Sequence, residues 1–265
     1  MDSRPIGIYD SGIGGLSVVK EIIAQLPYEE IVYIGDTKRA PYGNLNKVTI
    51  LEYALQMVEF LQGNNVKAIV AACNTTCSIL QNTMSKHFNL TIPIIGVVEP
   101  GVEAALKLGK KSVALLATQA TVNSGYYKKL LLEKEPNLEY MEAACLDFAS
   151  IVESGAVEKP EAYAAAKKQL LEIYEKKPEV VILGCTHFPF MKNAIASALK
   201  PGTVFSDPAV STAEKLKECL IENHLINDSY KKPSHQFYVT GQTEKFNFFL
   251  SSLLSEDAKA KQVDI

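Results

Sequence analysis

Short apolar runs alternate with helical patterns along almost the whole of this 265-residue chain. The runs have the length of buried strands, and the segments between them carry apolar residues at helical spacing. Strands and helices that alternate in this way are typical of βαβ units, whose strands form a parallel sheet. The pattern therefore predicts an α/β protein.

The positions of the runs predict the individual elements. We expect strands at residues 6–9, 30–35, 66–72, 93–97, 112–117, 140–144, 180–183 and 236–241. We expect helices at residues 16–26, 46–61, 78–87, 126–132, 161–174, 213–223 and 244–252. Asn46 is the expected N-cap of the second helix. The polar residues 255–265 are expected to fray.

The pattern runs twice along the chain. Each half reads strand, polar turn, helix, strand, helix, strand, and each series ends in a cysteine, Cys73 in the first half and Cys185 in the second. Because both the order and the spacing agree, we infer an old duplication. We expect two similar parallel-sheet α/β domains, with a cleft between them if the two halves face each other. Residues 1–97 plus 208–265 would form the first domain, and residues 98–207 the second.

The composition narrows the class of protein. With 47% hydrophobic and 22% charged residues, the chain resembles a soluble globular protein. A net charge of −3 gives no electrostatic case for binding nucleic acid or an anionic membrane. We find no apolar run of membrane-spanning length and no signal peptide. Five widely spaced cysteines favour free thiols, so we expect a cytoplasmic protein.

Polar side chains follow several predicted strands, at the edge of the sheet where open α/β proteins bind their ligands. Four such turns contain Asp10 and Ser11; Cys73, Asn74 and Thr75; residues 118–121; and Cys185, Thr186 and His187. If the two halves face each other, the two cysteines approach from opposite sides of a cleft. The cleft would then hold two thiols, a carboxylate and an imidazole.

The first turn, residues 10–15, has two interpretations. Glycines ahead of a helix let backbone N–H groups close around an anion. A tight strand-to-helix turn capped by Asp10 explains the same residues equally simply. Ser17 stands where a dinucleotide fingerprint needs its third glycine, so the turn is not that motif.

The cysteines also have competing interpretations. Cysteine is among the most buried residue types, so each thiol could simply belong to the core. The duplicated position and the polar neighbours argue against this. A metal site would recruit Cys73, Cys77, Cys185 and His187, but their spacing does not match a zinc knuckle. A cationic His187, two residues from Cys185, would instead favour the thiolate of that cysteine.

Two further features stay open at this point. Residues 36–43 form either an ordinary proline-containing loop or a flap whose Tyr42 hydroxyl and backbone N–H groups close over a substrate. Glu153 is either a carboxylate on a helix surface or a partner that orients His187.

Four motifs, taken together, resemble the glutamate racemase family, the cofactor-independent members of the aspartate/glutamate racemase superfamily. They are Asp10-Ser11-Gly12-x-Gly14-Gly15-Leu16, Gly35-Asp36-Thr37-x-Arg39-x-Pro41-Tyr42-Gly43, Ala72-Cys73-Asn74-Thr75 and Leu183-Gly184-Cys185-Thr186-His187-x-Pro189. They occur in the family's order and extend over nearly the whole chain. Residues 144–150 depart from the pattern, because relatives commonly have a proline after the cysteine there.

The resemblance implies interconversion of L- and D-glutamate without pyridoxal phosphate, nicotinamide or metal, and D-glutamate made in this way goes into bacterial peptidoglycan. It implies that Cys73 acts on D-glutamate with help from Asp10, and Cys185 on L-glutamate with help from His187. Glu153 is the expected partner of His187. The substrate-binding residues carried over are Asp10, Ser11, Pro41, Tyr42, Gly43, Asn74, Thr75, Thr121, Thr186 and His187. The expected partners are this small-molecule substrate and a second copy of the chain in a homodimer.

Three other functions remain open. An aspartate racemase would share the fold and the thiols, although Pro41, Tyr42 and Gly43 favour glutamate. A cysteine hydrolase or lyase would use one thiol as its nucleophile and leave the other idle. A two-lobed binding protein would use neither thiol.

Overall fold

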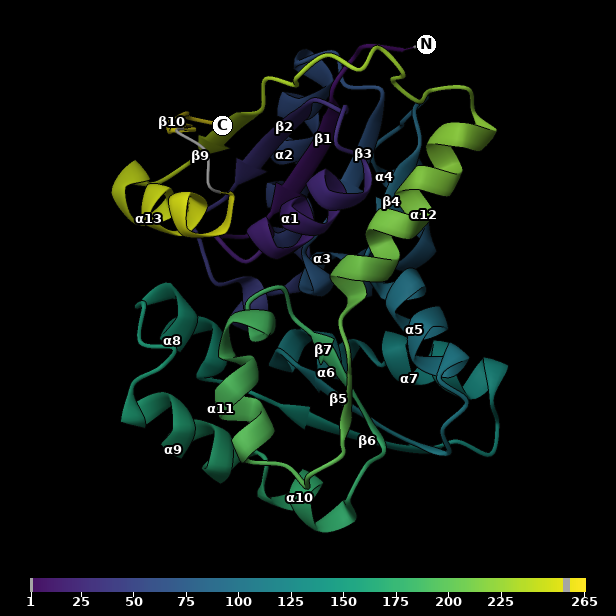
Figure 1. Ribbon diagram of the computed structural model, residues 1–265, viewed down its shortest axis with the longest axis vertical. Helices are drawn as coiled ribbons and strands as arrows, with labels where there is room; N and C mark the ends of the chain where they lie inside the picture. Colours follow the sequence, from purple (N-terminus) through teal and green to yellow (C-terminus); the bar gives the residue numbers. More distant parts are fainter. Residues whose placement is uncertain (1, 255–257) are drawn as a thin grey trace.

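The computed structural model describes residues 2–254 and 258–265, and the strands within them form two entirely parallel sheets. The first sheet has the strand order β10-β9-β2-β1-β3-β4, and the second has the order β6-β5-β7-β8. Figure 1 shows the first sheet in the upper part of the molecule and the second in the lower part. Each sheet with its helices is called a lobe below. The predicted α/β class with two parallel-sheet halves is confirmed.

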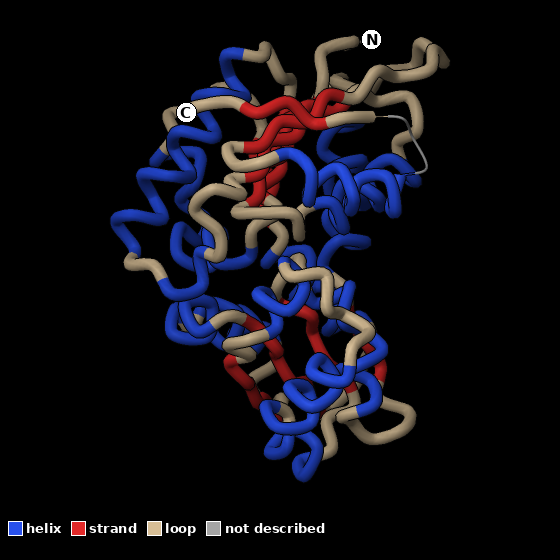
Figure 2. Tube along the Cα trace, turned by 90° about the vertical axis from the view of Figure 1, so that its left-hand side faces the viewer, coloured by secondary structure: helices blue, strands red, loops and turns tan. Residues whose placement is uncertain are grey.

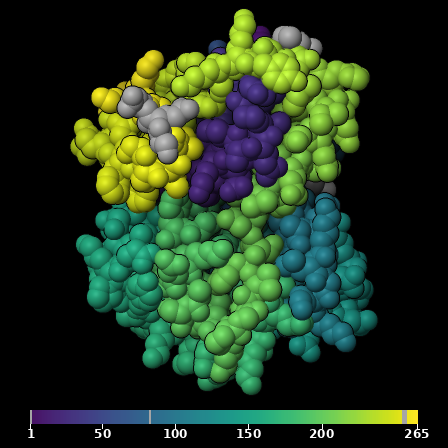
Figure 3. All heavy atoms as spheres, viewed as in Figure 1, coloured from purple at the N-terminus to yellow at the C-terminus, as the bar shows by residue number. Residues whose placement is uncertain are grey.

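Both ends of the chain contribute to the first lobe. Its strands are β1 (Ile6–Asp10), β2 (Ile31–Gly35), β3 (Ala68–Ala71), β4 (Ile94–Gly96), β9 (Gln236–Val239) and β10 (Ala260–Gln262). Its helices are α1 (Leu16–Gln25), α2 (Lys47–Gly63), α3 (Asn74–Leu80), α4 (Met84–His87), α12 (Pro208–Glu222) and α13 (Thr243–Leu254), with 3-10 turns η1 (Tyr42–Asn44) and η2 (Gln81–Thr83). Figure 3 shows the yellow C-terminal residues beside the purple N-terminal ones on its surface.

The second lobe is formed by the middle of the chain. Its strands are β5 (Ser112–Ala117), β6 (Glu139–Ala144), β7 (Val180–Gly184) and β8 (Val204–Ser206). Its helices are α5 (Val98–Lys107), α6 (Gln119–Ser124), α7 (Tyr126–Lys134), α8 (Phe148–Glu153), α9 (Pro160–Gln169), α10 (Leu171–Lys176) and α11 (Lys192–Ser197), with the 3-10 turn η3 (Phe188–Met191). The domain boundaries predicted at residues 97/98 and 207/208 stay a prediction.

The central strands explain why the sequence carries continuous apolar runs. Every residue of β1, β5 and β7 is buried. Figure 2 shows helices packed around the strands of each lobe. Since both faces of such a sheet are covered, its strands need apolar side chains at successive positions rather than at alternate ones.

The strand order of the second lobe repeats part of the first. The series β2-β1-β3-β4 recurs as β6-β5-β7-β8, so β3 and β7 occupy equivalent positions. Cys73 lies two residues after the end of β3, and Cys185 directly after the end of β7. This repeated order agrees with the inferred duplication and brings the two cysteines to corresponding edges of the two sheets.

Several predicted elements need correction. The helix expected at residues 78–87 begins instead at Asn74, and it is interrupted at Gln81, whose φ is 53°. The sequence prediction missed α5, because Pro100 and Gly101 resemble a turn, although proline is tolerated in the first turn of a helix. Smaller omissions were α8, α11 and β8.

The C-terminal end of the chain was also predicted wrongly. Fraying was expected over residues 255–265, but Ala260–Gln262 forms β10 and pairs with β9. Residues 255–257 lie outside the described part of the chain. Within that part, no helix combines the length and the hydrophobicity needed to cross a bilayer.

Candidate active site

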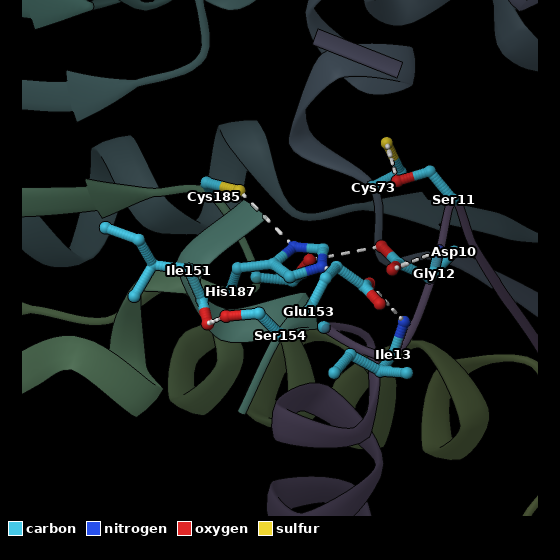
Figure 4. Close-up of polar contacts among 12 residues, drawn as sticks. Asp10, Ser11, Gly12, Ile13, Cys73, Ile151, Glu153, Ser154, Cys185 and His187 are labelled. Atoms are coloured by element: carbon cyan, nitrogen blue, oxygen red, sulfur yellow. Dashed lines mark hydrogen bonds and ion pairs between the residues drawn. The ribbon is translucent and has the colours of Figure 1, made fainter. Parts of the chain in front are cut away.

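The two predicted thiols lie at the boundary between the lobes. Figure 4 shows Cys73 and Cys185 on opposite sides of a group that contains Asp10, His187 and Glu153. Both cysteines are free thiols, and their exposed fractions are 3% for Cys73 and 7% for Cys185. The site is therefore closed in this structure, and the charges within it interact with little screening by water.

Asp10, the last residue of β1, is completely buried and held from both lobes. The backbone N–H of Gly12 donates to its Oδ2 at 3.0 Å, and the hydroxyl of Thr186, from the second lobe, donates to its Oδ1 at 3.2 Å. Burial raises the pKa of Asp10, and the nearby charge of His187 offsets part of this rise. The carboxylate is thus oriented and remains close to the boundary between the lobes.

Cys73 precedes the first residue of α3 and faces Asp10 and Ser11. Its Sγ donates to the Ser11 hydroxyl at 3.6 Å. Burial and the negative charge of Asp10 raise the pKa of Cys73, although the proximity of Thr76 and Ser11 acts in the opposite direction. These effects favour the protonated thiol at this position.

Cys185 has a different environment, because it lies next to a histidine that is itself bound to a carboxylate. His187 Nδ1 lies 3.7 Å from Cys185 Sγ, and His187 Nε2 lies 2.9 Å from Glu153 Oε1. Burial alone would lower the pKa of His187, but hydrogen bonds to Cys185 and Glu153 raise it well above its usual value. These contacts favour the protonated form of His187, whose ring lies next to the Cys185 sulfur.

The structure distinguishes the two interpretations of Glu153. Its carboxylate is directed at His187 and also accepts a hydrogen bond from the backbone N–H of Ile13 at 3.3 Å. Burial raises the pKa of Glu153, but the hydrogen bond and charge of His187 outweigh this effect and leave the pKa below its usual value. Glu153 therefore lies in an ion pair with His187, at the end of α8, rather than on a helix surface.

Three threonine hydroxyls form a buried cluster across the lobes. Thr118 Oγ1 lies 2.9 Å from Thr75 Oγ1 and donates to Thr121 Oγ1 at 3.0 Å. Thr75 and Thr121 were predicted substrate-binding residues, whereas Thr118 was noted only as part of a polar turn. Its position in the duplicated pattern, directly after β5, was the available signal. Gly43 approaches so closely that a Cβ there would lie 3.0 Å from Thr118 Cβ.

The loop at residues 36–43 is anchored by a buried carboxylate. Asp36 accepts hydrogen bonds from the Arg39 guanidinium at 2.5 Å, from the Thr240 hydroxyl at 2.7 Å and from the Tyr42 hydroxyl. The Tyr42 hydroxyl is thus bound to Asp36 in the interior, and the role of this loop in substrate binding stays a prediction. Pro41 and Gly43, on either side of Tyr42, are half-buried.

Asn74 has a partner that the sequence did not indicate. The hydroxyl of Tyr127, in α7 of the second lobe, donates to Asn74 Oδ1 at 2.6 Å. A tyrosine inside a helical pattern carries no spacing signal that would single it out. Ser11, Asn74, Thr75, Thr121, Thr186 and His187 are all buried near the two thiols.

The side chains of the metal interpretation do not converge on one point in the described part of the chain. No three His, Cys, Asp or Glu side chains among the described residues gather so that they could hold a metal ion. Cys77, which that interpretation required, instead donates its thiol to the backbone carbonyl of Ala71 at 3.2 Å.

Comparison with known proteins gives a consistent result. The family of Asp/Glu/hydantoin racemases matches residues 14–216. The glutamate racemase of Thermoanaerobacter pseudethanolicus is 37% identical over 257 residues, which cover 97% of this chain and 95% of that protein. The solved structure of glutamate racemase isoform RacE1 from Bacillus anthracis has a TM-score of 0.93 at 33% identity, covering 100% of this chain and 99% of the other. The glutamate racemase of Francisella tularensis, solved in complex with D-glutamate, has a TM-score of 0.91 at 37% identity, covering 100% and 98%. The chain therefore belongs to the aspartate/glutamate/hydantoin racemase family and, within it, to the glutamate racemases.

Proposed function

We propose that this protein interconverts L- and D-glutamate by proton transfer at Cα, with one cysteine on each face of the substrate. The observation that carries the proposal is the position of Cys73 and Cys185 at equivalent ends of a repeated sheet, on opposite sides of one buried group. A racemase removes a proton from one face of Cα and returns a proton to the other. Two opposed groups do this without moving around the substrate.

The environments of the thiols assign their starting states. Cys73, next to the carboxylate of Asp10, starts as the thiol and proton donor. Cys185, whose sulfur lies 3.7 Å from His187 Nδ1, is the proposed base. L-glutamate would lose its α-proton to Cys185 and gain one from Cys73. The two thiols then hold exchanged protonation states, which suit D-glutamate as the substrate for the reverse reaction.

The carbanion formed between these two steps needs hydrogen-bond donors in a dry site. Hydroxyls and backbone N–H groups that are already oriented stabilise such a charge without reorganising. We propose that Ser11, Asn74 and Thr186 bind one end of the substrate, while the threonine cluster and the loop at residues 41–43 bind the other. In the closed structure, the cluster hydroxyls donate to one another, and a carboxylate would accept those hydrogen bonds instead.

Substrate access requires the lobes to separate, because both thiols and Asp10 are almost fully buried. A cavity of about 480 Å³ adjoins the site, lined by residues that include Gly43, Ser78 and Gln119. It opens beside the threonine cluster, and we propose that the substrate enters through it when the lobes separate.

We further propose that the D-glutamate serves bacterial peptidoglycan synthesis, and that the protein acts in the cytoplasm as a homodimer. These proposals are supported by membership of the glutamate racemases alone.

Incubation with L-glutamate in deuterated water, followed by proton NMR and chiral chromatography, tests the function. A racemase replaces the α-proton by deuterium and forms D-glutamate. A parallel incubation with L-aspartate tests the rival substrate. A new product would indicate a hydrolase or lyase, and an unchanged substrate that still binds would indicate a binding protein. Either of these outcomes would refute the proposal.

A further inference from the structure

One hydrogen bond links a predicted substrate-binding residue to the opposite lobe. Tyr127 lies in α7 of the second lobe, and Asn74 is the first residue of α3 in the first lobe, directly after Cys73. The Tyr127 hydroxyl donates to Asn74 Oδ1 at 2.6 Å, and the exposed fractions of the two residues are only 1% and 4%. Figure 1 places α3 at the boundary between the lobes.

In this structure the Asn74 amide directs its oxygen toward Tyr127. A primary amide has an acceptor oxygen and a donor NH₂ group, and a hydroxyl that donates to the oxygen selects one of its two orientations. Burial raises the pKa of Tyr127 well above its usual value, so the hydroxyl keeps its proton at neutral pH. Among the described residues, Asn74 Nδ2 has no hydrogen-bond acceptor. The NH₂ group therefore remains available to a ligand.

We propose that Tyr127 is a positioning residue, which turns the Asn74 amide so that its NH₂ group donates to a carboxylate of the substrate. The inference rests on the proposed function, in which Asn74 binds glutamate. Because Tyr127 and Asn74 belong to different lobes, the amide is oriented only when the lobes are together. Tight binding of the substrate and closure of the lobes thereby become coupled.

The neighbouring residue provides a matched control. Tyr126 makes a hydrogen bond of the same length, 2.6 Å, to Glu99 Oε1, but Glu99 lies in α5 of the same lobe. Tyr126→Phe and Tyr127→Phe each remove one buried hydroxyl from one helix. Only Tyr127→Phe also frees the Asn74 amide.

The first measurement compares kcat and KM of these two variants with both enantiomers of glutamate. We expect Tyr127→Phe to raise KM roughly tenfold, the effect of one lost hydrogen bond on an equilibrium constant, and to change kcat much less. Tyr126→Phe should leave both constants near those of the unmodified protein. Equal KM values for Tyr127→Phe and the unmodified protein would overturn the proposal.

A double-mutant cycle separates positioning from a general structural role. Asn74→Ala removes the amide, so adding Tyr127→Phe to that variant should raise KM no further. If the double variant instead raises KM by the product of the two single effects, Tyr127 acts independently of Asn74. That result would also overturn the proposal.

Asn74→Asp gives a further test that does not depend on the folding of Tyr127→Phe. A carboxylate still accepts from Tyr127 but cannot donate to the substrate, so D-glutamate affinity should fall at least tenfold, measured calorimetrically. Unchanged affinity would refute the inference. If the unmodified protein exchanges the α-proton in deuterated water, such a failure concerns the Tyr127–Asn74 pair and not racemisation itself. If it does not, the proposed function itself has failed.

Discussion

Thr186 of the second lobe donates a hydrogen bond to Asp10 of the first, with 3.2 Å between Oγ1 and Oδ1. Thr186 directly follows Cys185, whereas Asp10 lies beside the opposite thiol, Cys73. The carboxylate expected to assist one cysteine is thus held by the neighbour of the other. The proposed site is complete only when the lobes are in contact. Five predictions test this site and its surroundings.

The two thiols should be individually indispensable. Cys73→Ser and Cys185→Ser should each lower kcat by about 10² to 10⁴, because a serine hydroxyl is a far weaker acid and base. Cys77→Ser is the matched control, since Cys77 lies one helical turn from Cys73 but donates to the Ala71 carbonyl. Circular dichroism measures the racemisation rate of each variant. Full activity of either serine variant would end the two-base mechanism.

Gly14 should tolerate no side chain. A Cβ at this position would lie 2.4 Å from Thr186 Oγ1 and 2.6 Å from His187 Nδ1. Gly14→Ala should therefore push these two residues away and abolish activity. Gly63→Ala is the control, because a Cβ there meets no atom within 4 Å, and alanine in a helix should stabilise by about 0.5 to 1 kcal/mol. An active Gly14→Ala variant would mean that the lobes do not need this contact for catalysis.

The pH dependence of kcat/KM should reflect the ion pair between His187 and Glu153. Glu153 helps to raise the pKa of His187, so Glu153→Gln should lower that pKa. Activity that requires the imidazolium disappears as pH rises through this pKa, and the alkaline limb of kcat/KM should therefore move to lower pH. Glu158→Gln, an exposed carboxylate on the same lobe, should leave the profile unchanged.

The same pair makes a prediction for stability. A raised pKa of His187 stabilises the folded state fully below its unfolded value of about 6.5, and this contribution disappears as pH rises through the folded pKa. The lowered pKa of Glu153 contributes above its unfolded value of about 4.3 and is lost as pH falls. Both contributions are fully present between about pH 4.3 and about pH 6.5. Glu153→Gln should thus lower the free energy of unfolding most in this pH range. A loss that does not vary with pH would contradict the assigned ion pair.

Asp36 should matter for stability as well as for substrate binding. Asp36→Asn leaves the largely buried Arg39 guanidinium without its counter-charge, and should lower the free energy of unfolding by about 3 kcal/mol. KM should rise too, since the loop that carries Pro41 and Gly43 loses its anchor. Urea denaturation measures the first effect, and Asp147→Asn, at an exposed carboxylate, is the control. A change below about 0.5 kcal/mol would show that the loop is held by other contacts.

Much of the fold was determined by the sequence alone. The apolar runs predicted β1, β2, β3, β5 and β7, because a strand covered on both faces needs continuous apolar residues. The repeated order of turns and cysteines predicted two equivalent halves, and the repeated strand order agrees with it. These features depend on local composition and periodicity, which a single chain displays directly.

Only the tertiary structure decided how the site is assembled. The partners of Tyr42 and Asn74, and the contact of Glu153 with Ile13, could not be predicted, because the same local sequence allows a polar side chain to face solvent, core or cleft. Glu153 accepts a hydrogen bond from Ile13, which lies 140 residues away in the chain. Asn74 accepts one from Tyr127, which lies 53 residues away. Such contacts depend on how the two sheets are oriented to each other. Burial raises the pKa of Cys73, whereas hydrogen bonds to Cys185 and Glu153 raise the pKa of His187 against the effect of burial.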